Sequence, residues 1–284
     1  MTRLARSGSL LVVALGLGCA SEKERPPPPT CLGDCGLSPG IGTGVSMPGG
    51  SAGAQGEGGA DAGTPQGVVL TGDVLVLNDD LDFMTGTPLT DTANIQTDGA
   101  DGRPVTGTWD GINPFVLTNV AAARPVWVLA TPPNGTADDA LPALEPVRTD
   151  APDANDTVTA NLALVHATTI DHIFALASVP LTTDATLGQV ILLLESKPVG
   201  ATTPSPLAGV TAQSSSAQGV IYAASGSFSD VATTTDNTGV VVLANVAGAA
   251  WPGAVINVLF SGAKTSGAQV RVVSGAVTIA TIEP

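Results

Sequence analysis

The chain has 284 residues, of which 12% are charged and 3% are aromatic, and its formal net charge is −15 at pH 7. So few charges argue against a coiled coil or a charge-driven disordered chain, and the acidic balance argues against binding to nucleic acid or anionic headgroups. Val, Ala, Leu and Ile occur with abundant Thr and Gly, a mixture typical of short β-strands and tight turns. The negative charge is interpreted as serving solubility, with cation binding as the alternative.

The first 18 residues have the anatomy of a signal peptide. Arg3 and Arg6 form a cationic start, and Leu10 to Leu15 begin an apolar run too short to span a bilayer. After this stretch no apolar run reaches the roughly 20 residues of a membrane helix. Residues 1–18 therefore predict export, with an ectodomain that does not itself enter the membrane.

Cys19 closes this stretch in the sequence Gly16-Leu17-Gly18-Cys19, which resembles the lipobox of bacterial lipoproteins. Gly18 fits that pattern, whereas Gly16 stands where the family usually has leucine. The resemblance implies a lipidated thiol on Cys19, with enough acyl chains to anchor the protein in a bilayer. Ala20, where some lipoproteins carry Asp, implies transfer to the outer membrane, facing the periplasm or the cell surface. Secretion without lipidation is the alternative.

Residues 19–66 are predicted to form a disordered tether. Positions 20–66 hold 12 Gly and 7 Pro among 47 residues and cannot build a core. Cys31 and Cys35 lie inside this tether, in a compartment that favours disulfides, and neither has a histidine nearby. We therefore expect a local disulfide between them, in preference to a redox or zinc site.

Strand-like segments recur from Val68 onward, each short, apolar and bounded by Gly, Pro, Asp or Asn. A window around two of them repeats at a constant offset, because residues 108–120 and 234–246 are identical at six of thirteen positions. The expected strands include Val74–Leu77, Phe115–Leu117, Val126–Leu129, Gln189–Leu194, Val220–Ala223, Val240–Leu243, Val255–Phe260, Val270–Val273 and Val277–Ile282.

The repeated window contains aspartate and asparagine at matching places. Asp110 and Asp236 are expected to cap tight turns through their side chains, and Asn119 and Asn245 suit the turn that follows each strand. These residue types sit where turn chemistry needs them. We therefore assign them a structural role and no catalytic one.

The sequence of Thr-Asp, turn, apolar strand and Asn-Val resembles the carboxypeptidase regulatory-like domain, a transthyretin-like β-sandwich. Residues 187–284 carry the better match, since Pro206 to Thr211 are similar to the opening strand of that family and Thr235 to Gly239 to its Asp-turn-Gly. Residues 67–131 form a looser first copy, in which Pro114 suits an edge strand. The resemblance implies an accessory, adhesive or stabilising domain without catalytic residues.

Residues 132–186 are predicted to join the copies through an acidic surface loop, from Thr131 to Thr157, and a short helix. Apolar side chains at i, i+3, i+4 and i+7 between Thr168 and Ala177 predict an amphipathic helix, with Thr168 and Asp171 as its capping box. The predicted fold class is thus all-β, with one or two transthyretin-like or Ig-like β-sandwich domains and one short helix after the tether.

The sequence offers few groups for chemistry. His166 and His172 are six residues apart, a spacing that does not put them on one helix face, so we expect His166 to end a strand and His172 to face solvent. The sequence contains no nucleophile elbow, zinc-protease motif, P-loop or dinucleotide fingerprint, and no cofactor is assigned. The weak candidates for Ca²⁺ are Asp79, Asp80, Asp82, Asp98 and Asp101, which lack EF-hand spacing and equally suit capped turns.

Three functions stay open at this point. The preferred one is a non-enzymatic envelope lipoprotein whose β-sandwich binds or adheres to an envelope protein or a glycan, and the others are a secreted hydrolase with an unrecognised site and a structural scaffold. Trp109, Trp127, Trp251 and Tyr222 are too scattered to predict a platform for stacking sugars. A hydrolase predicts a cleft that joins a histidine to carboxylates, whereas a binder predicts an exposed patch.

Overall fold

The computed structural model describes residues 34–35 and 67–284, apart from 78–85, 123, 134–138, 154, 198–202, 225 and 263–264. Cys19, Cys31 and nearly all of the predicted tether lie outside these residues. The described part is built of strands and one helix, which confirms the all-β class. The described residues all belong to one compact unit.

Each expected strand segment is found within a strand, Val273 alone excepted, which forms an isolated bridge after the end of β20. We refer to residues 67–166 as the N-terminal half and to residues 167–284 as the C-terminal half. The elements are β1 (Asp34–Cys35), β2 (Gly67–Gly72), β3 (Val74–Leu77), β4 (Gly86–Pro88), β5 (Ala93–Asp98), β6 (Pro104–Trp109), β7 (Phe115–Ala121), β8 (Pro125–Thr131), β9 (Ala140–Leu141), β10 (Ala143–Arg148), β11 (Thr157–Thr159), β12 (Leu162–His166), α1 (Ala167–Leu176), β13 (Gly188–Ser196), β14 (Ser205–Pro206), β15 (Val210–Gln213), β16 (Gly219–Ala224), β17 (Ser227–Ser229), β18 (Val240–Val246), β19 (Ala254–Gly262), β20 (Ser266–Val272) and β21 (Val277–Ile282).

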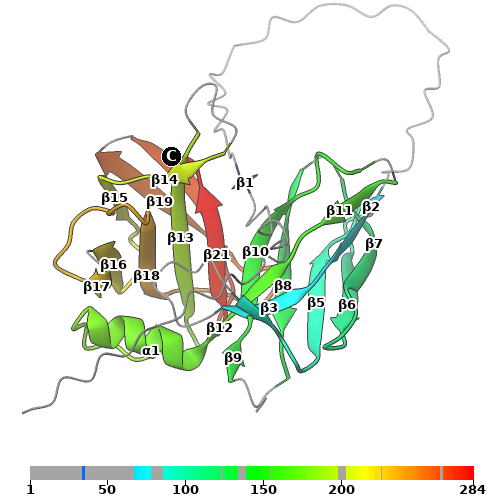
Figure 1. Ribbon diagram of the computed structural model, residues 1–284, viewed down its shortest axis with the longest axis horizontal. Coiled ribbons are helices and arrows are strands. Elements are labelled where there is room, and N and C mark those ends of the chain that lie inside the picture. Colours follow the sequence, from blue (N-terminus) through cyan, green and yellow to red (C-terminus); the bar gives the residue numbers. More distant parts are fainter. Residues whose placement is uncertain are drawn as a thin grey trace, which may run out of the picture. The chain divides into compact units, whose positions relative to one another are not determined.

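One main sheet runs through both halves, in the strand order β17-β16-β18-β13-β21-β10-β8-β5-β6 (Figure 1). The halves meet where β10 and β21 pair in parallel, with Ala143 opposite Val277 and Leu144 opposite Thr278. β10 lies in the stretch predicted to be a surface loop, and that prediction is wrong there. Its residues 143–147 are all buried, because β10 is a central strand of the main sheet.

The N-terminal half is a sandwich around one core. The main-sheet strands β5, β6, β8 and β10 pack on two small sheets, β11-β2-β7 and β4-β3-β12-β9. Alternation in the sequence explains the packing, since β5 buries Ala93, Ile95 and Thr97 and turns the residues between them outward. β7 is an edge strand preceded directly by Pro114, as the proline suggested.

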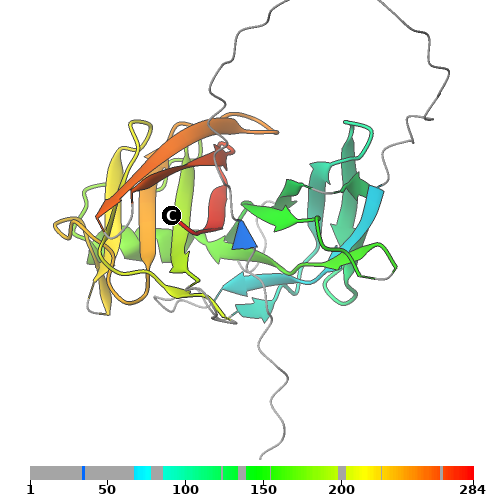
Figure 2. The ribbon, with the colours of Figure 1, turned by 90° about the horizontal axis from the view of Figure 1, so that it is seen from above.

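The C-terminal half has three layers. The sheet β15-β19-β20 covers one face of the main sheet, and α1 with part of β12 covers the other (Figures 1 and 2). The central strands β13, β18 and β21 are therefore buried on both faces. That explains why they are nearly continuous apolar runs where a two-layer sandwich would show alternation.

The repeated window is a repeat of backbone geometry. Asp110 accepts hydrogen bonds from the amides of Ile112 (2.9 Å) and Asn113 (2.7 Å), and Asp236 accepts one from the amide of Thr238 (2.9 Å). Asp110 is exposed, and the hydrogen bonds that its carboxylate accepts lower its pKa to about 2. Both aspartates thus cap turns, as predicted.

Asn119 and Asn245 lie at equivalent places in the two copies, where the pairing between neighbouring strands is irregular. Asn119 has φ 62° and Asn245 has φ 49°, the left-handed region that asparagine tolerates better than most residues. At each of them the register with the neighbouring strand shifts, between Val68 and Leu70 in β2 and between Gly188 and Val190 in β13. Both asparagines therefore form β-bulges rather than turns between strands.

The helix α1 is confirmed, but its predicted capping box is wrong. His166 is the N-cap residue and makes no capping hydrogen bond with its side chain. Asp171 instead accepts hydrogen bonds from the amide (3.2 Å) and the hydroxyl (2.7 Å) of Thr183. Burial of Ile170, Ile173 and Phe174 holds the helix on the main sheet.

The opening strand expected from the family resemblance is interrupted. Its first part is β14, which pairs with β13, and its second part is β15, which pairs with β19 in another sheet. Gly209 lies between them with φ 77°, which allows the chain to change sheets there. Among the described residues, no helix has the length and apolar character needed to cross a membrane.

Candidate functional site

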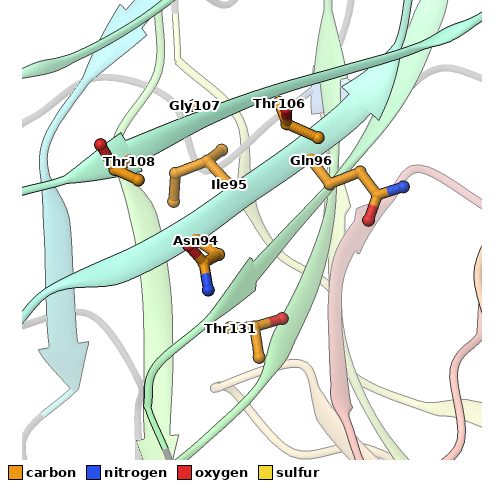
Figure 3. Close-up of a pocket in the computed structure, with 7 residues that line it drawn as sticks. All are labelled: Asn94, Ile95, Gln96, Thr106, Gly107, Thr108 and Thr131. Atoms are coloured by element: carbon orange, nitrogen blue, oxygen red, sulfur yellow. The ribbon is translucent and has the colours of Figure 1, made fainter.

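A polar depression of about 240 Å³ lies on the outward face of the main sheet in the N-terminal half (Figure 3). It is lined by three neighbouring strands and contains no charged side chain. The lining residues are Asn94, Ile95 and Gln96 of β5, Thr106, Gly107 and Thr108 of β6, and Thr131 of β8.

The strand register places the polar side chains in rows. Asn94 lies between Thr108 on one neighbouring strand and Thr131 on the other, so two hydroxyls flank one amide. Two residues further along β5, Gln96 lies beside Thr106 of β6. Because side chains that are two residues apart on a strand share a face, these rows form one hydrogen-bonding surface.

The depression ends towards the C-terminal half at an ion pair. Asp98 follows Asn94 and Gln96 on the same face of β5, and its carboxylate lies 3.6 Å from the guanidinium of Arg271 in β20. Both side chains are about a quarter to a third exposed, at 27% and 29%.

This lining can bind but has no group suited to transfer a proton at neutral pH. Amide and hydroxyl side chains donate and accept hydrogen bonds without ionising. An uncharged ligand with many hydroxyl or amide groups matches such a surface, because each of its polar groups finds a partner without burial of a charge. The depression is thus suited to binding a neutral polar molecule.

The five weak calcium candidates are divided by the structure. Asp79, Asp80 and Asp82 lie outside the described residues. Asp98 is engaged with Arg271, and Asp101 accepts a hydrogen bond from the amide of Arg103 (3.0 Å), which caps a turn. Over the described ranges, no three His, Cys, Asp or Glu side chains gather in a way that could hold a metal ion.

The histidines lie where the sequence predicted, and neither lines the polar depression. His166 ends β12 and His172 is exposed on α1. The predicted disulfide cannot be placed, since Cys31 lies outside the described residues and only the backbone of Cys35 is described. Cys19 also lies outside them.

The three tryptophans and Tyr222 pack against buried apolar residues. Trp109 is buried and donates from its indole nitrogen to the carbonyl of Leu89 (3.0 Å), and Tyr222 is buried with its hydroxyl bonded to the backbone of Ala212. Trp127 and Trp251 are half-buried against a small cluster where the halves meet. None of these four aromatic side chains lines the polar depression.

Glu145 is a buried acid that the sequence reasoning missed. Its carboxylate accepts a hydrogen bond from the amide of Ala163 in β12, and burial raises its pKa to about 8. It lies in the stretch predicted as a loop, between Ala143 and Val147, which both face the core. The sequence Ala-Leu-Glu-Pro-Val at 143–147 does not alternate between apolar and polar residues, so no local pattern marked this strand.

A second depression is apolar and lies where the two halves meet. Pro125, Trp127 and Pro146 line it from the N-terminal half, and Val270, Ala280 and Ile282 are among the residues that line it from the C-terminal half. It contains no cluster of titratable groups.

No family model matches the sequence, and no curated protein matches it.

Proposed function

We propose that the chain is a non-enzymatic binding module of the cell envelope, and that its ligand is a neutral, polyhydroxylated chain such as a glycan segment. The observation that carries this proposal is the polar depression, whose three-strand lining offers amides and hydroxyls and no charge. The carboxypeptidase regulatory-like resemblance is consistent with an accessory role.

The same proposal includes attachment to a bilayer. The charged start, the short apolar run and Cys19 support export and lipidation, with outer-membrane placement suggested by Ala20. Acyl labelling of the wild type and of Cys19→Ser tests this part, and equal labelling of both would refute it. An anchored protein with a glycan-binding face would hold the envelope and a polysaccharide together.

The binding test is a titration of the protein with neutral oligosaccharides of glucose, galactose and N-acetylglucosamine, followed by amide chemical shifts. We expect shifts at Asn94, Gln96 and Thr131, with weak affinity, about 1 mM, because no aromatic ring adds stacking. Asn94→Ala should abolish the shifts. Asn257→Ala, at an exposed site on β19, is the matched control and should leave them intact. Absence of shifts up to about 10 mM in the wild type would exclude a glycan as ligand.

A second candidate ligand is an envelope protein, and it is favoured by a different surface. The outward face of β19 exposes Val255 (55%) and Leu259 (61%), on the middle strand of the sheet β15-β19-β20. Large apolar side chains in the centre of an exposed sheet are typical of protein contacts. Cross-linking in intact cells with a photoreactive group at residue 257 tests it. If the products disappear in Leu259→Ser, the apolar face is responsible; products that persist would reject this surface.

A further inference from the structure

The strand β21 has one edge that the ectodomain's own strands leave partly open. β13 pairs with it along its whole length, from Val277 to Ile282. On the other edge of β21, β10 pairs only with Val277 and Thr278. The opposite edge of β10 pairs with β8 along the whole strand. β10 therefore offers no partner to Thr281 and Ile282, which are 6% exposed in the presence of β1. Backbone groups at a buried strand end need hydrogen-bonding partners.

β1 pairs with the open stretch. Asp34 lies opposite Thr281 and Cys35 opposite Ile282, in parallel. Figures 1 and 2 both show β1 beside the end of β21, in the space that β10 leaves. A piece of the segment that composition assigns to the tether thus belongs to the main sheet.

The surroundings explain why a strand is favoured there. The apolar depression between the halves adjoins the same residues of β21, since Ala280, Thr281 and Ile282 line it. Its opposite wall includes Pro125 and Pro146, whose backbones have no amide to donate. A strand that pairs with Thr281 and Ile282 of β21 therefore lies beside this apolar wall.

We propose that β1 is a permanent strap of the ectodomain, which binds in this place and closes the junction between the two halves. The occupant is the protein's own chain at Asp34–Cys35, and its binding mode is the addition of a strand to a sheet edge. With lipid on Cys19, as proposed above, only residues 20–33 would then separate the anchor from β1.

The test is site-specific photo-cross-linking in the full-length protein. A photoreactive residue replaces Gln269, which is exposed and lines the apolar depression, and in a matched control it replaces Gln213, which is exposed on β15 of the same small sheet. We expect the product from position 269 to map to the peptide that contains Asp34 and Cys35, and position 213 to give none. A product from position 269 with another protein, with another part of the chain, or with no residue at all would overturn the proposal.

Hydrogen exchange supplies an independent measurement. Asp34→Pro removes a backbone donor from β1, and Ala52→Pro makes the same change elsewhere in the Gly-rich segment. Exchange of the peptide 277–282 should accelerate about tenfold or more in Asp34→Pro, as an edge opens to solvent, and stay at the wild-type rate in Ala52→Pro. Equal exchange in both variants would show that β1 does not hold this edge. Neither result depends on the glycan proposal.

Discussion

Glu145 places a carboxyl group against the backbone of β12, in the interior of the N-terminal half. β12 pairs with β3 along one edge and with β9 at Val165 and His166 along the other, and the amide of Ala163 donates to Glu145. The carboxylate thus satisfies a buried donor, and its own burial raises its pKa to about 8 from an ordinary 4.5. The burial that brings Glu145 to the amide of Ala163 thus also moves the pKa of its carboxyl group into the neutral range.

Glu145→Gln should make stability less dependent on pH. Between pH 4.5 and about 8 the folded protein holds a proton that the unfolded chain has lost, so stability from this group is present below pH 4.5 and is lost as pH rises to about 8. The variant should match the wild type near pH 4 and exceed it by roughly 2 kcal/mol or more at pH 9, after allowance for an unpaired amide. Urea unfolding across this range measures the effect. Glu283→Gln, at an exposed site, is the control, and parallel pH profiles for Glu145→Gln and wild type would contradict the prediction.

The two bulge asparagines differ in what their side chains do. Asn245 is buried, exchanges hydrogen bonds with Gln189 (2.7 and 2.9 Å) and donates to the carbonyl of Thr182 (3.1 Å), whereas Asn119 is exposed. Asn119→Ala should cost about 1 kcal/mol from its positive φ alone. Asn245→Ala should cost roughly 2 to 4 kcal/mol, because it also leaves Gln189 partly unpaired. Equal losses in chemical denaturation would disprove the assigned network.

The repeated residues could be read from the sequence because each works locally, within a turn of a few residues. Asp110 and Asp236 need only their own neighbours to cap a turn. Glu145 could not be recognised, since its role depends on β12, and the proline and acidic residues around it are typical of loops.

At the scale of elements, the central strands β13, β18 and β21 were predictable, whereas β5 and β6, two of the three strands that line the polar depression, were not. β13, β18 and β21 are nearly continuous apolar runs. β5 and β6 show polar residues on their outward faces, and β6 buries only Trp109 fully. The depression itself arises from the register in which β5 pairs with β6 and β8, and the sequence of each strand alone does not determine that register.

The helix α1 is expected to depend on one buried aromatic ring. Phe174 is 1% exposed in the core shared with β13 and β18, while Leu176 is 37% exposed two residues later. Phe174→Ala should lower the free energy of unfolding by about 3 to 5 kcal/mol, and Leu176→Ala by less than about 1 kcal/mol. Thermal melts of both variants provide the measurement, and similar losses would mean that the helix does not dock as described.

At the scale of the whole molecule, the two halves share strands rather than a linker. β12 turns Leu162 and Leu164 into the N-terminal core and Ala163 and Val165 into a core of the C-terminal half. A further cluster joins Leu129 and Leu144 with Val273 and Ala276. One main sheet crosses the junction, so the repeats seen in the sequence are parts of a single cooperative structure.

A single unfolding transition is therefore expected from calorimetry. Phe115→Ala in the N-terminal half and Phe260→Ala in the C-terminal half remove equally buried rings. Each should lower the midpoint of the same transition, because neither core can persist without the shared strands. Two separated transitions in either variant would show instead that the halves unfold independently.

The strands that are buried on both faces have a consequence for the chain before it folds. Val190–Leu194 and Val240–Val246 are β-branched and aliphatic segments without charge or proline, the composition that self-associates into cross-β aggregates. In the native sheet these two segments pair with each other, their outer edges pair with β21 and β16, and both of their faces are covered. Substitutions that destabilise the fold should thus be recognised first by loss of soluble protein, before any loss of ligand binding.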